Sequence, residues 1–219
     1  MKNLQKMGGV AALYMAAAYV LGIVGFKLVA DYSAVSDPTE KVAFLMDNQA
    51  IMYILHLLVY VVWSFFLVVL ALALYNRLKS GSPAIMQVAT ALGLIWAGLV
   101  VASGMVFNIG MDTVIDLFGQ DPAQAATVWL AIESVFEGLG GGNEIVGGLW
   151  VLLVSWAALQ TGGLPRLLNY LGLLIAVAGI LSAIPPLSEI GAAVFGLGQI
   201  VWFVWLGIIM LRNSPSEAV

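Results

Sequence analysis

Six stretches of this chain are strongly apolar and almost free of charge, and they constrain its fold more than any other feature. They cover residues 10–30, 51–75, 86–109, 142–161, 167–184 and 190–211. A helix needs roughly 20 mostly apolar residues to cross the hydrocarbon core of a bilayer. Only two charged side chains fall inside these stretches, Lys27 near one end and Glu144. The pattern predicts six membrane-spanning helices.

The composition agrees with an integral membrane protein and excludes several kinds of site. Hydrophobic residues make up 62% of the chain and charged residues 9%, whereas soluble domains carry about 25% charged residues. The absence of cysteine excludes disulfides and cysteine-based metal sites. The single histidine, His56, excludes every site that needs two histidines. No spacing motif supports a metal site, and nothing in the sequence indicates a cofactor or nucleic-acid binding.

The distribution of charge predicts the orientation in the membrane, because cytoplasmic loops carry an excess of lysine and arginine. With a cytoplasmic N-terminus, only Lys27 and Lys41 fall on the outer side. The other six basic residues then lie inside: Lys2, Lys6, Arg77, Lys79, Arg166 and Arg212. Of the twelve acidic residues, only Glu217 is inside. We therefore expect both termini in the cytoplasm and a multi-pass protein of the inner (cytoplasmic) membrane.

Two of the outer connections carry the same helix-start signal. Asp37-Pro38 and Asp121-Pro122 each combine an N-cap residue with proline at the first helical position. After the second signal, apolar residues recur at helical spacing, as in an amphipathic helix that lies either at the membrane surface or on the helix bundle. The sequence thus predicts amphipathic outer helices before the second and fourth spans.

The inward-running spans also resemble one another. They read HLLVYVVW at 56–63, NEIVGGLW at 143–150 and GQIVWFVW at 198–205, with valine fourth and tryptophan eighth. Such an internal repeat predicts three helical hairpins in one transmembrane domain over residues 1–219. Chance similarity between short apolar runs is the alternative. The predicted fold class is an all-α, polytopic six-helix bundle built as three hairpins.

The repeat places polar residues at one level of the three inward helices: His56, then Asn143 and Glu144, then Gln199. Such groups are costly in hydrocarbon unless they are paired or face water. We therefore expect them to converge in the outer half of the bundle. Ser103 and Asn108 on the third span and Ser182 on the fifth lie at similar depth and are candidates to join them. The alternative is that Glu144 is an ordinary acidic residue of a first helical turn, and His56 a neutral, hydrogen-bonded side chain.

Glu133 and Glu137 precede this level and are four residues apart, so they share one helix face. The glycine-rich segment 138–142 follows, where glycine lets a helix stop and turn. With these two, the candidate ligand-binding residues are His56, Asn143, Glu144, Gln199, Glu137, Glu133, Ser103 and Asn108. No residue is predicted to be catalytic.

Three segments resemble those of uncharacterised bacterial multi-pass inner-membrane proteins that form a family of unknown function. They are LYNRLK at 74–79, GGGNEIVGGLWVLLVS at 140–155 and FGLGQIVWFVWLGIIMLR at 195–212. The resemblance covers nearly the whole chain and implies a fold and a compartment. It brings no catalytic motif.

The leading functional hypothesis is a small binding or transport module for an ion, a proton or a small polar or amphipathic ligand. Its polar site would face the outer side. The first alternative is a non-catalytic accessory subunit of a larger membrane complex. The second is an intramembrane enzyme, which the sequence disfavours because it holds no catalytic motif. The expected partners are the lipid bilayer and either another membrane protein or further copies of this chain.

Overall fold

The structure, a computed structural model, describes residues 2–29, 31–141 and 144–212. These residues form helices joined by short turns, and none of them lies in a strand. Four helical stretches within the described residues are long and apolar enough to cross a membrane: Asn3–Lys27, Gln49–Leu78, Pro83–Phe118 and Pro185–Arg212. A fifth candidate, Pro122–Thr161, extends over residues 142–143, which lie outside the described residues. The predicted all-helical, multi-span fold is confirmed. The arrangement as three hairpins, the internal repeat and the single domain stay predictions.

Two of the predicted spans differ in length from the helices observed. The fifth is helix α8 (Arg166–Leu181), whose 16 residues extend about 24 Å at a rise of 1.5 Å per residue. The third belongs to α5 (Pro83–Phe118), whose 36 residues extend about 54 Å on the same rise. Helix α5 continues past the predicted end because Met111 and Val114 are buried on one face while Asp116 stays exposed.

Contacts group the described residues into two compact units. The first, called the pocket unit here, comprises the described residues of 18–63 and 99–142. The second, called the α7–α9 unit, comprises those of 1–17, 64–98 and 143–219. Helices α1 (Lys2–Val24) and α5 contribute to both units, and the first residue of α4 (Trp63–Leu78), Trp63, belongs to the pocket unit.

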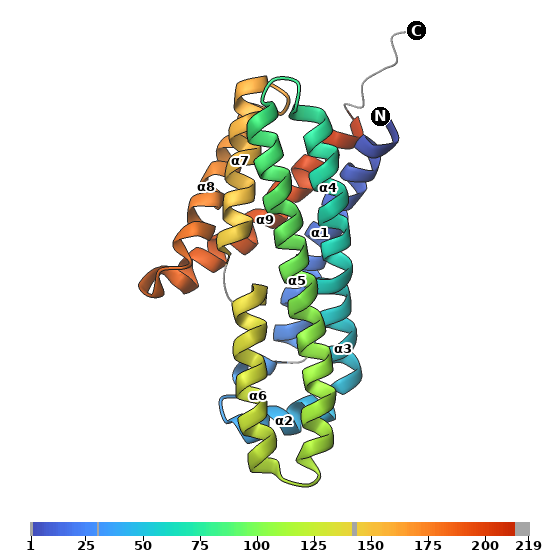
Figure 1. Ribbon diagram of the computed structural model, residues 1–219, viewed down its shortest axis with the longest axis vertical. Coiled ribbons are helices and arrows are strands. Elements are labelled where there is room, and N and C mark those ends of the chain that lie inside the picture. Colours follow the sequence, from blue (N-terminus) through green and yellow to red (C-terminus); the bar gives the residue numbers. More distant parts are fainter. Residues whose placement is uncertain (1, 30, 142–143, 213–219) are drawn as a thin grey trace. The chain divides into compact units, whose positions relative to one another are not determined.

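The pocket unit contains the end of α1, the later half of α5 and a series of short helices. These are the π-helical turn η1 (Gly25–Val29), η2 (Tyr32–Ala34), α2 (Pro38–Asp47), α3 (Gln49–His56), the π-helical segment η3 (Leu57–Val62), α6 (Pro122–Phe136) and η4 (Glu137–Gly141). Helices α2 and α6 pack against each other (Figure 1). Their apolar faces share one core with α3 and α5, formed by Val42, Leu45, Met52, Phe107, Met111, Val114, Ala125, Trp129 and Phe136.

Both predicted outer helices form and begin where the sequence indicates. The side chain of Asp37 accepts hydrogen bonds from the N–H groups of Thr39 and Glu40 at the start of α2. Asp121 accepts one from the N–H of Gln124 at the start of α6. In each helix proline follows the capping residue, where a missing N–H costs nothing. Capping of both helices is therefore confirmed.

The glycine-rich segment after α6 ends that helix, as expected. Gly140 has φ 164° and ψ 4°, which breaks the helical path within η4. A Cβ at Gly140 would lie 3.3 Å from Val100 Cγ2 and 3.6 Å from Val100 Cα. Glycine therefore also lets this turn approach the backbone of α5 closely.

The α7–α9 unit contains α4 (Trp63–Leu78), the first half of α5, α7 (Ile145–Thr161), α8, the turn η5 (Pro185–Leu187) and α9 (Ser188–Arg212). Helix α8 packs against both α7 and α9 (Figure 1). Small residues allow the close approach of α7 and α8, since a Cβ at Gly148 would lie 2.9 Å from Ala176 O. Trp150 fills the interior, with ring centroids 5.8 Å from Trp96 and 5.9 Å from Trp202.

Candidate ligand-binding site

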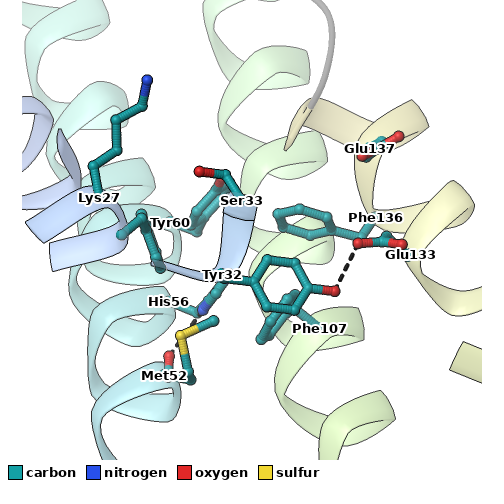
Figure 2. A pocket seen from close by; sticks show the side chains of 11 residues that line it. Lys27, Tyr32, Ser33, Met52, His56, Tyr60, Phe107, Glu133, Phe136 and Glu137 are labelled. Atoms are coloured by element: carbon teal, nitrogen blue, oxygen red, sulfur yellow. Dashed lines mark hydrogen bonds between the residues drawn. The ribbon is translucent and has the colours of Figure 1, made fainter. Parts of the chain in front are cut away.

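The pocket unit encloses a partly open cavity of about 200 Å³. Its lining comes from segments far apart in the sequence, namely η1 with η2, then α3 with η3, α5, and α6 with η4 (Figure 2). The lining residues are Phe26, Lys27, Tyr32, Ser33, Met52, His56, Tyr60, Phe107, Glu133, Phe136 and Glu137. Three of the predicted site residues, His56, Glu133 and Glu137, are among them.

His56 lies between aromatic rings in the wall of this cavity and is only 3% exposed. Its ring stacks on Phe107 with centroids 3.4 Å apart, and on Tyr60 with centroids 5.3 Å apart. Phe26 and Phe136 contact the imidazole at 4.8 and 5.6 Å. The wall is therefore a set of aromatic faces with one histidine among them.

A backbone contact decides which ring nitrogen of His56 can accept a hydrogen bond. Nδ1 lies 2.8 Å from the carbonyl oxygen of Met52. Because a carbonyl only accepts, Nδ1 must carry the proton. In the neutral imidazole, Nε2 then keeps its lone pair and is the ring nitrogen with which this lining residue can accept a hydrogen bond.

A polar network ties η2 and α2 to α6 beside the cavity. The indole N–H of Trp129 donates to the Tyr32 hydroxyl at 2.6 Å. That hydroxyl donates in turn to Glu133 Oε1, also at 2.6 Å (Figure 2). Lys41 Nζ donates to both carboxylate oxygens of Glu133, at 2.7 and 2.9 Å. The charge of Glu133 is therefore already balanced by Lys41.

The environment keeps the Tyr32 hydroxyl protonated. Burial contributes most, and the hydrogen bond and charge of Glu133 add to it, so the pKa of Tyr32 lies well above its ordinary value of 10.0. The neighbouring charge of Glu137 raises this pKa further. Tyr32 thus acts as a fixed donor to Glu133, and its ring completes the cavity wall.

Two charged residues of the lining remain uncommitted. Neither the Lys27 ammonium nor the Glu137 carboxylate forms a hydrogen bond or ion pair with another residue in the described ranges, and both residues are exposed. In Figure 2 the Lys27 ammonium points away from His56, and Glu137 lies on the opposite side of the view. Glu137 is therefore the acidic group of the lining with capacity for a new partner.

Ser103 and Asn108, also predicted as site residues, support the walls of the cavity from α5. The hydroxyl of Ser103 donates to the carbonyl oxygen of Phe136 at 2.8 Å, which holds the end of α6. The amide nitrogen of Asn108 donates to the carbonyl oxygen of Tyr53 at 3.3 Å, which holds α3. Neither belongs to the cavity lining.

The remaining predicted residues belong to the other unit or lie outside the described residues. Glu144 occupies the N-cap position of α7, makes no side-chain capping bond, and its N–H donates to Ser182 Oγ at 3.3 Å. Gln199 on α9 is 0% exposed, and its side-chain amide makes no hydrogen bond within the described part of the chain. Asn143 lies outside the described residues. The predicted convergence of these three residues with His56 stays a prediction.

Sequence reasoning missed Tyr32, Lys41 and Phe107. Trp129 lies in the segment predicted to form the amphipathic helix before the fourth span, but its polar N–H was not assigned to a site. One available signal was that Lys27 and Lys41 are the only basic residues on the predicted outer side. The pairing of Tyr32 with Glu133 left no local signal, since 101 positions separate them.

The groups around the cavity are suited to recognising a ligand. They provide aromatic faces, one ring nitrogen and one uncommitted carboxylate. Among the described residues, no group of three or more His, Asp or Glu side chains is placed to hold a metal ion.

Comparison with known proteins shows the family to which the chain belongs. No curated protein and no solved structure matches it. The family profile of a domain of unknown function, DUF4386, matches residues 10–209. The resemblance to an uncharacterised family is thus confirmed, whereas a bacterial origin and an inner-membrane location stay predictions. Several helices of this protein are long and apolar enough to cross a membrane. Because the family match includes most of the chain, this protein belongs to the DUF4386 family.

Proposed function

We propose that this protein is a small membrane-embedded binding or transport module whose site is the cavity of the pocket unit. The observation that carries the proposal is the cavity of about 200 Å³ with aromatic walls, the Nε2 of His56 and the uncommitted carboxylate of Glu137. Small-molecule sites are typically concave and mostly apolar, with a few polar groups that fix orientation. The volume limits the ligand to a small molecule or to one end of a larger one.

The charge pattern supports a location in the cytoplasmic membrane with both termini inside. Nine of the twelve acidic residues lie in 18–63 and 99–142, together with only Lys27 and Lys41. The other six basic residues lie in the α7–α9 unit. Positively charged loops favour the cytoplasmic side, so the cavity would be reached from the outer side.

The absence of cysteine from the chain makes a direct test of the site practical. Ser33→Cys places one thiol at an exposed position of the lining, and Thr113→Cys places one at an exposed position on α5 outside it. Benzylamine, benzyl alcohol and benzoate serve as probes that fit the cavity. Since a ligand that binds the folded state stabilises it, at least one probe should raise the melting temperature of protein purified in a maltoside detergent.

Alkylation of Ser33→Cys with a bulky maleimide should abolish that shift, and alkylation of Thr113→Cys should leave it intact. If no probe shifts the melting temperature, or if the shift survives modification of Ser33→Cys, the proposed site is wrong.

An accessory role in a larger membrane complex is a second candidate, favoured by helix α8. Its length of about 24 Å falls short of the roughly 30 Å of bilayer hydrocarbon. A short span can be accommodated by oligomerisation. Its exposed side chains Leu167, Tyr170, Leu174 and Val177 form an apolar face. Covalent crosslinking in native membranes from a cysteine at Leu174 would reveal a protein neighbour, and its absence would leave lipid as the partner of this face.

A further inference from the structure

The pocket unit carries a strong excess of negative charge. It contains nine aspartates and glutamates and two lysines. One of those lysines, Lys41, is held by Glu133 with side-chain exposures of 19% and 12%. A surface with such an excess of one sign raises the local concentration of ions of the opposite sign. Cations are therefore enriched around this unit.

The cavity also offers the two kinds of group that bind an organic cation. Its aromatic rings belong to Phe26, Tyr32, Tyr60, Phe107 and Phe136. The faces of such rings attract ammonium groups, with an energy that grows when the cation is desolvated. Glu137 adds a carboxylate that no lysine or arginine of the described residues neutralises.

The groups that could bind an anion are either paired with Glu133 or directed away from His56. Tyr32 donates its proton to Glu133, and Lys41 is paired with the same carboxylate. Lys27 is exposed, and its ammonium points away from His56 in Figure 2. In the neutral imidazole, His56 offers the cavity an acceptor because Nδ1 carries the proton toward Met52.

We infer that the ligand of this cavity is a small organic cation, an ammonium group on a compact apolar body, held between the aromatic rings and Glu137. This inference rests on the proposed function and adds the charge class of the ligand. Such an ammonium group can belong either to a free metabolite or to the headgroup of a lipid.

Choline and its uncharged carbon isostere 3,3-dimethylbutan-1-ol differ in charge at nearly constant shape, so their comparison tests the charge class. Isothermal titration calorimetry of the full chain in maltoside should show choline binding about tenfold tighter or more, the scale of a desolvated cation–π contact with a carboxylate nearby. Equal or weaker binding of choline would overturn the cation class while leaving the cavity as a binding site. Failure of both compounds to bind, together with no shift by the benzyl probes, would overturn the proposed function as well.

Two variants assign the effect to named residues. Glu137→Gln removes the carboxylate from the lining and should weaken choline binding several-fold with little effect on the isostere. Asp116→Asn is the matched control, because it removes the same charge from an exposed position of α5 outside the cavity. Equal losses in both variants would show that only the general field acts and would overturn the assignment to the cavity.

Phe26→Leu keeps an apolar side chain but removes one ring face. It should weaken the binding of choline and leave the binding of the isostere unchanged, and an equal effect on the two compounds would contradict ring–cation recognition.

Glycerophosphocholine, a soluble lipid headgroup, distinguishes between the two sources of the ligand. If glycerophosphocholine binds more tightly than choline, the ligand is a lipid headgroup. If it binds more weakly, the ligand is a free cation.

Discussion

Tyr32 and Glu133 are joined by a hydrogen bond of 2.6 Å across 101 positions of the sequence. The bond fixes the short helix η2 against α6 and places the Tyr32 ring in the cavity wall. Glu133 is thereby shared between a tyrosine that positions the wall and a lysine that balances the charge.

Breaking the pair of Lys41 and Glu133 should destabilise the pocket unit. Glu133→Gln keeps an acceptor for Tyr32 but leaves a half-buried ammonium without its counter-charge, at a cost of about 1–3 kcal/mol. Lys41→Met should cost a similar amount. The double variant should lose less stability than the sum of the two single changes, because it leaves no unpaired charge at either position. Thermal unfolding in maltoside measures all three, and strictly additive losses would contradict the pairing.

The contribution of Tyr32 should depend on pH in one direction. Burial, followed by Glu133, raises the pKa of Tyr32 above its ordinary value of 10.0. Its stabilisation is therefore fully present below about pH 10 and falls as the pH rises, since the unfolded tyrosine loses its proton first. Wild type should melt above Tyr32→Phe at pH 8, and the gap should narrow between pH 10 and pH 11. A constant gap would show that the hydroxyl titrates normally in the folded protein, and a widening gap would show a lowered pKa; either result would contradict the raised pKa of Tyr32.

Replacing Gln199 with leucine should raise the melting temperature. Its amide is fully buried in α9 without a hydrogen bond to the described residues, an arrangement that costs about 1–3 kcal/mol in proteins. Gln160→Leu is the control, since Gln160 Oε1 accepts a 2.8 Å hydrogen bond from Ser82. That change should give no gain. A lower melting temperature for Gln199→Leu would mean that the amide has a partner that stabilises the protein.

Two glycine-to-alanine changes in helices should have opposite signs. At Gly172 in α8 a Cβ would contact Ser155 Oγ on α7 and lie 2.9 Å from Trp202 Nε1 on α9, so Gly172→Ala pushes α8 away from both helices. At Gly98 in α5 a Cβ would meet no atom within 4 Å. Alanine favours the helix over glycine by up to about 1 kcal/mol. Gly172→Ala should lower the melting temperature and Gly98→Ala should keep or raise it, and the same response at both sites would refute the close packing at Gly172.

Single cysteines at Ser80 and Ser188 should report the orientation. The chain has no cysteine of its own, and the excess of lysine and arginine predicts Ser80 inside and Ser188 outside. An impermeant maleimide added to intact cells should label Ser188→Cys, and Ser80→Cys should react only after the membrane is opened. Labelling of Ser80→Cys from outside would reverse the orientation.

Much of the helical framework follows from local sequence. Residues 10–30 or 51–75 are apolar in themselves, and a bilayer requires that their backbone groups bond within a helix. The starts of α2 and α6 are equally local, because an aspartate caps the N–H groups of the next turn. The end of α6 is likewise encoded locally, by the glycine-rich segment that follows Phe136. These features depend on neighbours a few residues away.

The candidate site could be predicted only in part. His56, Glu133 and Glu137 were visible as polar residues in an apolar chain, and all three line the cavity. Their roles depend on contacts that no local pattern encodes. Lys41, 92 positions from Glu133, balances its charge, and Phe107 covers the imidazole of His56.

The sequence alone therefore determined which segments are helices and where two of them begin, because apolar length and capping act between near neighbours. The tertiary structure decided that Glu133 is paired while Glu137 is uncommitted, although the two carboxylates are four residues apart on one helix face. It also decided that aromatic rings from distant segments form one cavity wall. The physical reason is that the state of a charged or aromatic group depends on what the folded chain brings within a few ångströms of it.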